Sequence, residues 1–265
     1  MEFFSGLDFF QPEGATTAGL LALRLTGLIW IAPVFSSRVL KTQTKSAILI
    51  VLVAALWPVA MSHAVDAGFS VVLVLSELLV GLTLGLAGAI FIAAAESAGD
   101  MLAVQMGLSG ANVVDPMSST QLPVLGQFLG LFVTAMVLAL GGHTVILTAL
   151  SKSLQLLPIG TPVDFAAGLP GVIDLGSKLL WLGLKIAGPV IAAMMIGNAS
   201  LGVLARTVPQ LNVLMVAFPV QIAIGLFVLG GTLPFIASFF TGWNQTYLDL
   251  AGELLLPLTP VEGGS

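Results

Sequence analysis

Residues 70–95 read SVVLVLSELLVGLTLGLAGAIFIAAA, and this stretch decides the class of the protein. Its one charged residue is Glu77, and the others are apolar, small or hydroxylated. The hydrocarbon core of a bilayer is about 30 Å thick, and a helix of about 20 mostly apolar residues crosses it. We therefore expect this stretch to form a membrane-spanning helix.

Five further stretches have the same character, at residues 15–35, 46–64, 123–148, 178–205 and 212–240. Of the 265 residues 57% are apolar and 8% charged, against about 25% charged in an ordinary soluble domain, and the mean hydropathy is +1.09. Glycines and prolines inside the long stretches favour kinked helices and hairpins over straight rods. The sequence predicts an all-α, polytopic membrane protein with about six long apolar helical segments.

The remaining sequence is divided into short pieces around one integral membrane domain that covers residues 1–265. We expect an acidic N-terminal tail at 1–14, an internal polar loop at 105–122 and a C-terminal tail at 241–265. The first tail has no Lys or Arg, so it lacks the basic start of a signal peptide and the first segment is expected to be retained. Arg38, Lys41 and Lys45 form the one basic cluster, which places residues 36–45 in the cytoplasm by the positive-inside rule.

Composition argues against several kinds of function. The chain has no Cys and two His, a poor supply of metal ligands, and no cofactor or metal is expected. A net charge of −5 gives no basic face for nucleic acid. The phosphate-binding sequence GxxxxGK[ST] is absent from the sequence, so nucleotide hydrolysis is not expected of this chain.

Ionisable side chains in or beside the apolar segments need a reason, because each costs at least a few kcal/mol at bilayer depth. Arg24 and Glu77 are the deepest, and a structural ion pair between them is the favoured interpretation, with proton coupling by Glu77 or Glu96 as the alternative. Lys178 and Lys185 lie on one helical face, where long side chains reach the interface. Small residues at four-residue spacing, such as Gly81 with Gly85 and Gly126 with Gly130, predict close helix packing, either within the chain or between subunits.

The polar loop allows two interpretations, because non-helical backbone at membrane depth is tolerated only inside protein or beside a watery cavity. It is either a surface connection or part of a constriction. Residues Gly107 to Gly110 also match the GxSG box of rhomboid-type proteases, with His143 as a conceivable base. That box is short, and Asp115-Pro116 follow where a rhomboid helix would continue, so no catalytic residue is assigned.

Several strings together resemble the FliR family of flagellar export-gate proteins, whose virulence counterparts form the SctT family. The similar strings are RLTGLIWIAPVFSS at 24–37, ELLVGL at 77–82, QMG at 105–107, DP at 115–116, GGH at 141–143, RTVPQLN at 206–212 and FP at 218–219. The resemblance runs from about residue 20 to 235.

The resemblance implies an inner-membrane subunit of the flagellar basal body, without enzymatic activity. It implies assembly with FliP-like and FliQ-like subunits, beside FlhB-like and FlhA-like export components, into a pore for unfolded flagellar proteins. Alternatives are a virulence type III secretion subunit and, from another class, a small-molecule secondary transporter with broken helices and midplane charges.

The resemblance also implies roles for particular residues. The polar loop would be a plug in the lumen, and its candidate residues are Gly107, Leu108, Ser109, Gly110, Asn112, Val113, Val114, Asp115, Pro116 and Met117. Apart from the resemblance, the chemistry of helix ends suits Arg206, Pro209, Gln210 and Asn212 to a polar junction between two long helices, which either caps the helix ends or docks a neighbouring subunit.

Overall fold

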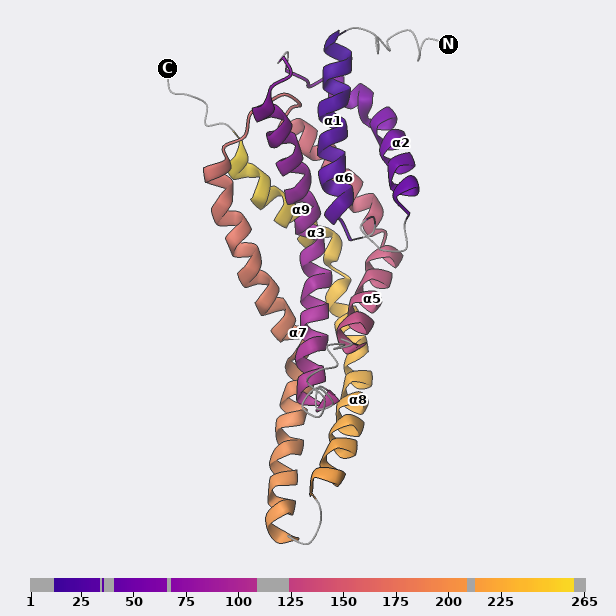
Figure 1. Ribbon diagram of the computed structural model, residues 1–265, viewed down its shortest axis with the longest axis vertical. Coiled ribbons are helices and arrows are strands. Elements are labelled where there is room, and N and C mark those ends of the chain that lie inside the picture. Colours follow the sequence, from indigo (N-terminus) through magenta and orange to yellow (C-terminus); the bar gives the residue numbers. More distant parts are fainter. Residues whose placement is uncertain are drawn as a thin grey trace, which may run out of the picture. The chain divides into compact units, whose positions relative to one another are not determined.

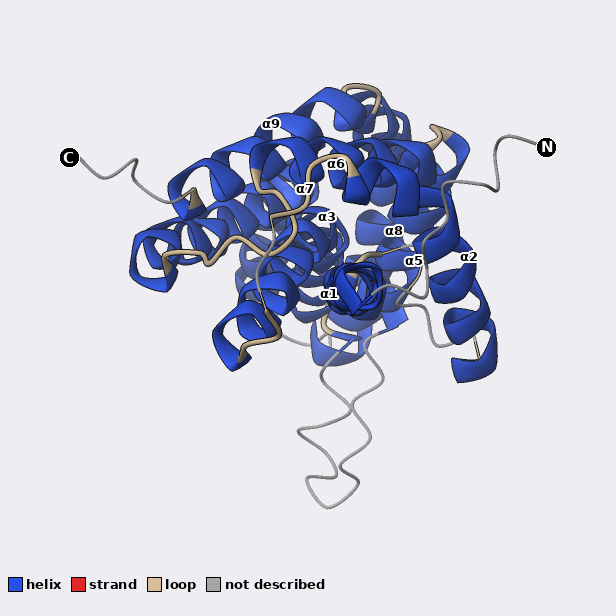
Figure 2. Cartoon of the chain, turned by 90° about the horizontal axis from the view of Figure 1, so that it is seen from above, coloured by secondary structure: helices blue, strands red, loops and turns tan. Residues whose placement is uncertain are grey.

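The computed structural model of the protein describes residues 12–33, 35, 41–65, 68–108, 124–208 and 213–259. Within these ranges the regular structure is entirely helical (Figures 1 and 2). The elements are α1 (Pro12–Ile31), α2 (Thr42–Met61), α3 (Val71–Gln105), α5 (Val124–Ala139), α6 (Gly142–Leu156), α7 (Phe165–Thr207), α8 (Val213–Phe240), α9 (Trp243–Leu255) and the 3-10 helix η3 (Leu256–Leu258). The all-α prediction is confirmed.

The predicted number of spans is also confirmed. Five helices are long and apolar enough to cross a membrane, namely α1, α2, α3, α7 and α8, and the bent pair α5–α6 makes a sixth if it counts as one span. The pair is bent by 70°, and the break falls at Gly141, whose φ is +76°. Glycine reaches positive φ without steric cost, so the Gly141-Gly142 pair can interrupt the helix here.

Three boundaries differ from expectation. Helix α3 continues to Gln105, beyond the expected apolar stretch 70–95, and α7 already begins at Phe165, before the expected stretch 178–205. Residues 243–255 were assigned to a C-terminal tail but form α9. Its buried residues Tyr247, Leu250, Ala251 and Leu254 follow the spacing of one helical face. This amphipathic pattern is too polar for a spanning helix, which is why a hydropathy argument overlooked it.

The chain divides into two compact units. Unit 1 contains the described parts of Met1–Ala89, Gly141–Leu175 and Asn244–Ser265, and therefore α1, α2, α6, most of α9, and the first parts of α3 and α7. In this unit α1 packs against α2 and α2 contacts α6. The Tyr247 hydroxyl donates a hydrogen bond to the Leu84 carbonyl at 3.0 Å, which ties α9 to α3. Burial raises the pKa of this hydroxyl, which keeps it a donor.

Unit 2 contains Ile90–Leu140 and Gly176–Trp243 where they are described, and therefore the second parts of α3 and α7 with α5 and α8. Helix α5 contacts α8. An aromatic cluster joins α3 to the end of the unit, with the Phe91 ring 6.3 Å from that of Phe240 and 5.9 Å from that of Trp243. Both contacts are edge-to-face, the geometry that aromatic pairs favour.

Candidate functional site

The most deeply buried charged group of unit 1 is an ion pair between α1 and α3. The Arg24 Nε donates to the Glu77 Oε2 at 2.6 Å, and each residue is 1% exposed. The Arg24 Nη1 donates to the Ser153 carbonyl at 3.2 Å and to its Oγ at 3.3 Å. The backbone amide of Gly160 donates to the Glu77 Oε1 at 3.1 Å. The structure therefore pairs Arg24 with Glu77, as the sequence analysis favoured.

This cluster joins four pieces of chain that are far apart in sequence. Arg24 comes from α1, Glu77 from α3, Ser153 from α6, and Gly160 from the connection between α6 and α7. A buried charge is tolerated only when it is paired and its remaining hydrogen-bonding positions are used. Here both Glu77 carboxylate oxygens accept a hydrogen bond from the protein. The four residues therefore hold their segments together, and this group is called the clamp below.

The glycines beside the clamp allow the helices to approach closely. A Cβ atom on Gly81 would collide with the Arg24 carbonyl oxygen, and one on Gly27 would lie 2.6 Å from the Leu78 carbonyl oxygen. A Cβ on Gly85 would lie 3.0 Å from that of Ile31. The ridge formed by Gly81 and Gly85 therefore packs within the chain, against α1.

Glu96 and Asp100 lie on α3 in unit 2, on the stretch that faces α5. A Cβ on Gly130 would lie 2.6 Å from the Glu96 Cγ, and one on Gly126 would collide with the Asp100 carboxylate. Both carboxylate residues are exposed. The Gly126 and Gly130 ridge of α5 is therefore also used within the chain, where it accommodates two acidic side chains.

The start of the predicted plug loop is described, and most of the loop is not. Gly107 has φ +71°, and a Cβ there would lie 2.8 Å from the Phe218 ring. Met106 is fully buried against Gly225 of α8, whereas Leu108 is 41% exposed. The other candidates lie outside the described residues: Ser109, Gly110, Asn112, Val113, Val114, Asp115, Pro116 and Met117.

A polar pair lies in the same unit as the start of this loop. The Gln221 Nε2 donates to the Asn198 Oδ1 at 2.8 Å, which links α7 to α8, and the Gln221 side chain is also a neighbour of Gly107. The sequence analysis missed Gln221. Four-residue spacing from Gly225, on an otherwise apolar helix, is the signal that could have found it.

The other polar candidates are separate from these groups. Arg206 is exposed in the last turn of α7, whereas Pro209, Gln210 and Asn212 lie outside the described residues. Lys185 places its amine 4.7 Å from the Trp181 ring centre and 4.6 Å from that of Phe239. An ammonium group is attracted to the faces of aromatic rings, so these contacts fix the position of the Lys185 amine between α7 and α8.

Large apolar side chains remain exposed on several helices. Of the apolar stretch that could span a membrane, 11% is buried in α2 and 17% in α8, against 61% in α3. The most exposed large side chains on α8 are Phe227 and Met215. Contiguous apolar surface of this kind needs lipid or another protein to cover it. Among the described residues, no three His, Asp or Glu side chains are grouped to hold a metal.

These features define a multi-pass helical membrane protein in which polar side-chain contacts link helices inside each of the two units. The chain belongs to family 1 of the bacterial export proteins, whose family model matches residues 15–246. It is 30% identical to the flagellar biosynthetic protein FliR of Pectobacterium carotovorum subsp. carotovorum, over 89% of this chain and 92% of the relative. It is 31% identical to FliR of Escherichia coli K12, with the same coverages of 89% and 92%.

A relative with a different name is also similar, at lower identity. The surface presentation of antigens protein SpaR of Salmonella typhimurium is 25% identical over 85% of this chain and 86% of its own length. The family resemblance that the sequence strings indicated is confirmed. This chain is a bacterial export protein.

Proposed function

We propose that this protein is a core subunit of the flagellar type III protein export gate. It assembles with FliP-like and FliQ-like subunits, beside FlhB-like and FlhA-like components, into the pore through which unfolded flagellar proteins leave the cytoplasm. Its place is the bacterial inner membrane, at the flagellar basal body. The observation that carries the proposal is the family match over residues 15–246, which includes all or nearly all of each helix in the described residues that is long enough to span a membrane.

The flagellar assignment is favoured over the virulence one because several FliR proteins are more similar to this chain than SpaR is. The two FliR proteins are 30% and 31% identical to this chain, and SpaR is 25% identical. The family match also favours an export role over small-molecule transport. The chain catalyses no bond chemistry in this proposal, and its part is to form a passage.

The sparse cover of α2 and α8 supports assembly with other subunits. Most of the apolar stretch of each of these helices is exposed. In a monomer in water or detergent, no specific partner covers that surface. Burial of apolar surface is worth about 25 cal/mol per Å2. Neighbouring subunits that cover these helices would therefore stabilise the chain strongly.

The loop at 105–122 is proposed to be the plug of the closed pore. Leu108, Val113, Val114 and Met117 would occlude the lumen by apolar contact, since a dry constriction is a barrier to ions. Gly107 and Gly110 would permit the loop to swing aside. Two features of the described part support this role: the positive φ of Gly107 and the exposure of Leu108, which lies two residues after the buried Met106.

Removing the plug tests this part of the proposal. Deleting residues 110–116 is expected to raise the ion conductance of the assembled gate in planar bilayers, while a deletion of the same length at the C-terminus, 259–265, leaves conductance low. Conductance unchanged by the first deletion, in a complex of normal mass, would contradict the plug role.

The export role itself is tested in the host cell. Deleting the gene for this protein is expected to abolish the appearance of hook and filament proteins in the medium, and plasmid-borne wild type restores it. Normal secretion of both proteins in the deletion strain would contradict the proposal.

A further inference from the structure

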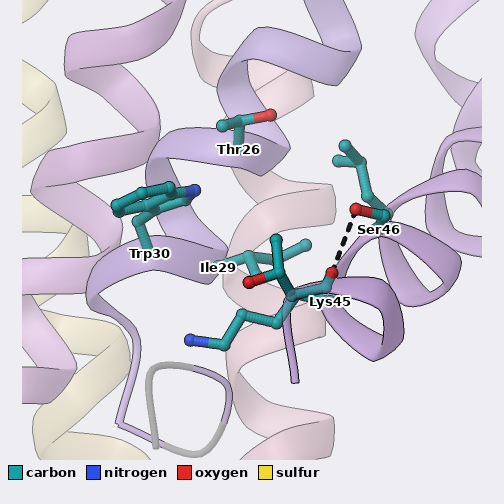
Figure 3. Close-up of a pocket in the computed structure, with 7 residues that line it drawn as sticks. Thr26, Ile29, Trp30, Lys45 and Ser46 are labelled. Atoms are coloured by element: carbon teal, nitrogen blue, oxygen red, sulfur yellow. Dashed lines mark hydrogen bonds between the residues drawn. The ribbon is translucent and has the colours of Figure 1, made fainter. Parts of the chain in front are cut away.

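A groove of about 140 Å3 lies between α1 and the first turns of α2, within unit 1. Its polar wall comes from Thr26 on α1 and from Thr42, Lys45 and Ser46 on α2, and its aromatic wall is Trp30. Figure 3 shows the Lys45 side chain extending from α2 toward α1. We infer that this groove binds the headgroup of an anionic phospholipid.

Charge favours an anion at this place. Lys45 is the one charged side chain among the described residues that line the groove. The first turn of α2 has no acidic residue, and Lys41 at its N-cap forms no side-chain capping bond. The amino-terminal end of a helix carries partial positive charge and exposed amide donors. The Lys45 ammonium group and the positive end of α2 therefore both attract a bound anion.

The hydroxyl groups suit a headgroup that also carries alcohols. The Ser46 Oγ donates to the Thr42 carbonyl at 3.0 Å, and the Thr26 Oγ1 donates to the Ala22 carbonyl at 2.7 Å. Each hydroxyl hydrogen is thus used inside its own helix, and the oxygens are left as acceptors. A phosphatidylglycerol headgroup supplies both partners: a phosphate for Lys45 and hydroxyl donors for the two oxygens.

The apolar surface beyond the groove indicates a lipid and not a free phosphate. Thr42, Ser46 and Ile50 are spaced by four residues, so they lie along one face of α2. That row changes from polar to apolar, and Ile50 is 69% exposed with Val51 beside it at 65%. Trp30 is 71% exposed at the same end of α1, and tryptophan is enriched where membrane meets water. A headgroup in the groove can thus lay its acyl chains along α2.

The inference does not depend on the export role, and it is tested by lipid binding. The full-length protein is purified in detergent and titrated with phosphatidylglycerol or phosphatidylcholine, and bound lipid is counted by native mass spectrometry. Wild type is expected to bind phosphatidylglycerol in preference. Lys45→Gln is expected to weaken that binding roughly fivefold and to leave phosphatidylcholine binding unchanged.

Two further variants sharpen the result. Lys152→Gln removes an exposed lysine on α6 that does not line the groove, and is expected to bind like wild type. Ser46→Phe fills the groove but keeps Lys45, and is expected to lose the preference. The inference is overturned if Lys45→Gln binds phosphatidylglycerol like wild type, if Lys152→Gln weakens binding equally, or if excess inorganic phosphate displaces the lipid as readily as free phosphatidylglycerol does.

Discussion

The buried pair of Arg24 and Glu77 makes a sharp prediction about stability. Arg24→Met removes the guanidinium and leaves the Glu77 side chain, which is 1% exposed, with the hydrogen bond from the Gly160 amide. Removing one partner of a buried ion pair costs about 3–5 kcal/mol. For a chain of this size, 1 kcal/mol corresponds to roughly 2–4 °C in Tm. The apparent Tm should therefore fall by about 10 °C.

The assay is intrinsic tryptophan fluorescence of the detergent-purified protein, heated at one fixed rate because such unfolding is often irreversible. Arg206→Met is the matched control, since Arg206 is an exposed arginine at a helix end; it should lower Tm by less than about 3 °C. The double variant Arg24→Met/Glu77→Leu removes both charges and should melt above Arg24→Met. A single variant that melts with wild type, or a double variant whose loss is the sum of the two single losses, would refute the clamp.

Three further predictions follow from the packing. Gly99→Val places a side chain against the backbone of α5, so it should destabilise the protein by at least about 1–3 kcal/mol in the same melting assay. Gly202→Val is the control and should be well tolerated, because nothing lies within 4 Å of a Cβ there. Equal losses of stability in the two variants would contradict this packing. Tyr247→Phe deletes one buried hydrogen bond and should cost about 1 kcal/mol, and a melting curve like that of wild type would show that the bond does not anchor α9. Gly107→Ala places a residue with a Cβ at a positive φ, which costs about 1–2 kcal/mol. This strain at the start of the plug loop should raise the ion leak of the assembled gate, and unchanged conductance would contradict the prediction.

The parts of the fold that were predicted are those that hydropathy and single residues control. Long apolar runs predicted the spanning helices, and glycines inside those runs predicted kinks, one of which is the break at Gly141 between α5 and α6. The pairing of Arg24 with Glu77 was favoured because two opposite charges in apolar segments have few other partners. Each of these inferences needs only local chemistry.

Tertiary contacts explain what could not be predicted. The partners Ser153 and Gly160 of the buried pair are ordinary residues, and only the fold brings them to Arg24 and Glu77. The small-residue ridges fit packing within the chain or between subunits equally well by sequence, and only coordinates show Gly126 against Asp100. Helix α9 was overlooked because only one of its faces is apolar, so its mean hydropathy is low.

The lysines of α7 show the same limit. Lys185 was expected to reach the membrane interface, and its long side chain is exposed, but its position is defined by the rings of Trp181 and Phe239. Trp181 lies one turn before it on α7, and that contact was open to prediction from spacing. Phe239 comes from α8, and no sequence pattern relates it to Lys185.

The central claim is that this protein is one subunit of a hetero-oligomeric export gate. The most direct test is to co-express it with the FliP-like and FliQ-like proteins of the same source, purify through a tag on this chain, and measure the mass of the intact complex by native mass spectrometry. The account predicts a discrete assembly that contains all three proteins. A tagged chain that purifies alone, as a monomer or homodimer, while the other two are present in the same membranes, would contradict it.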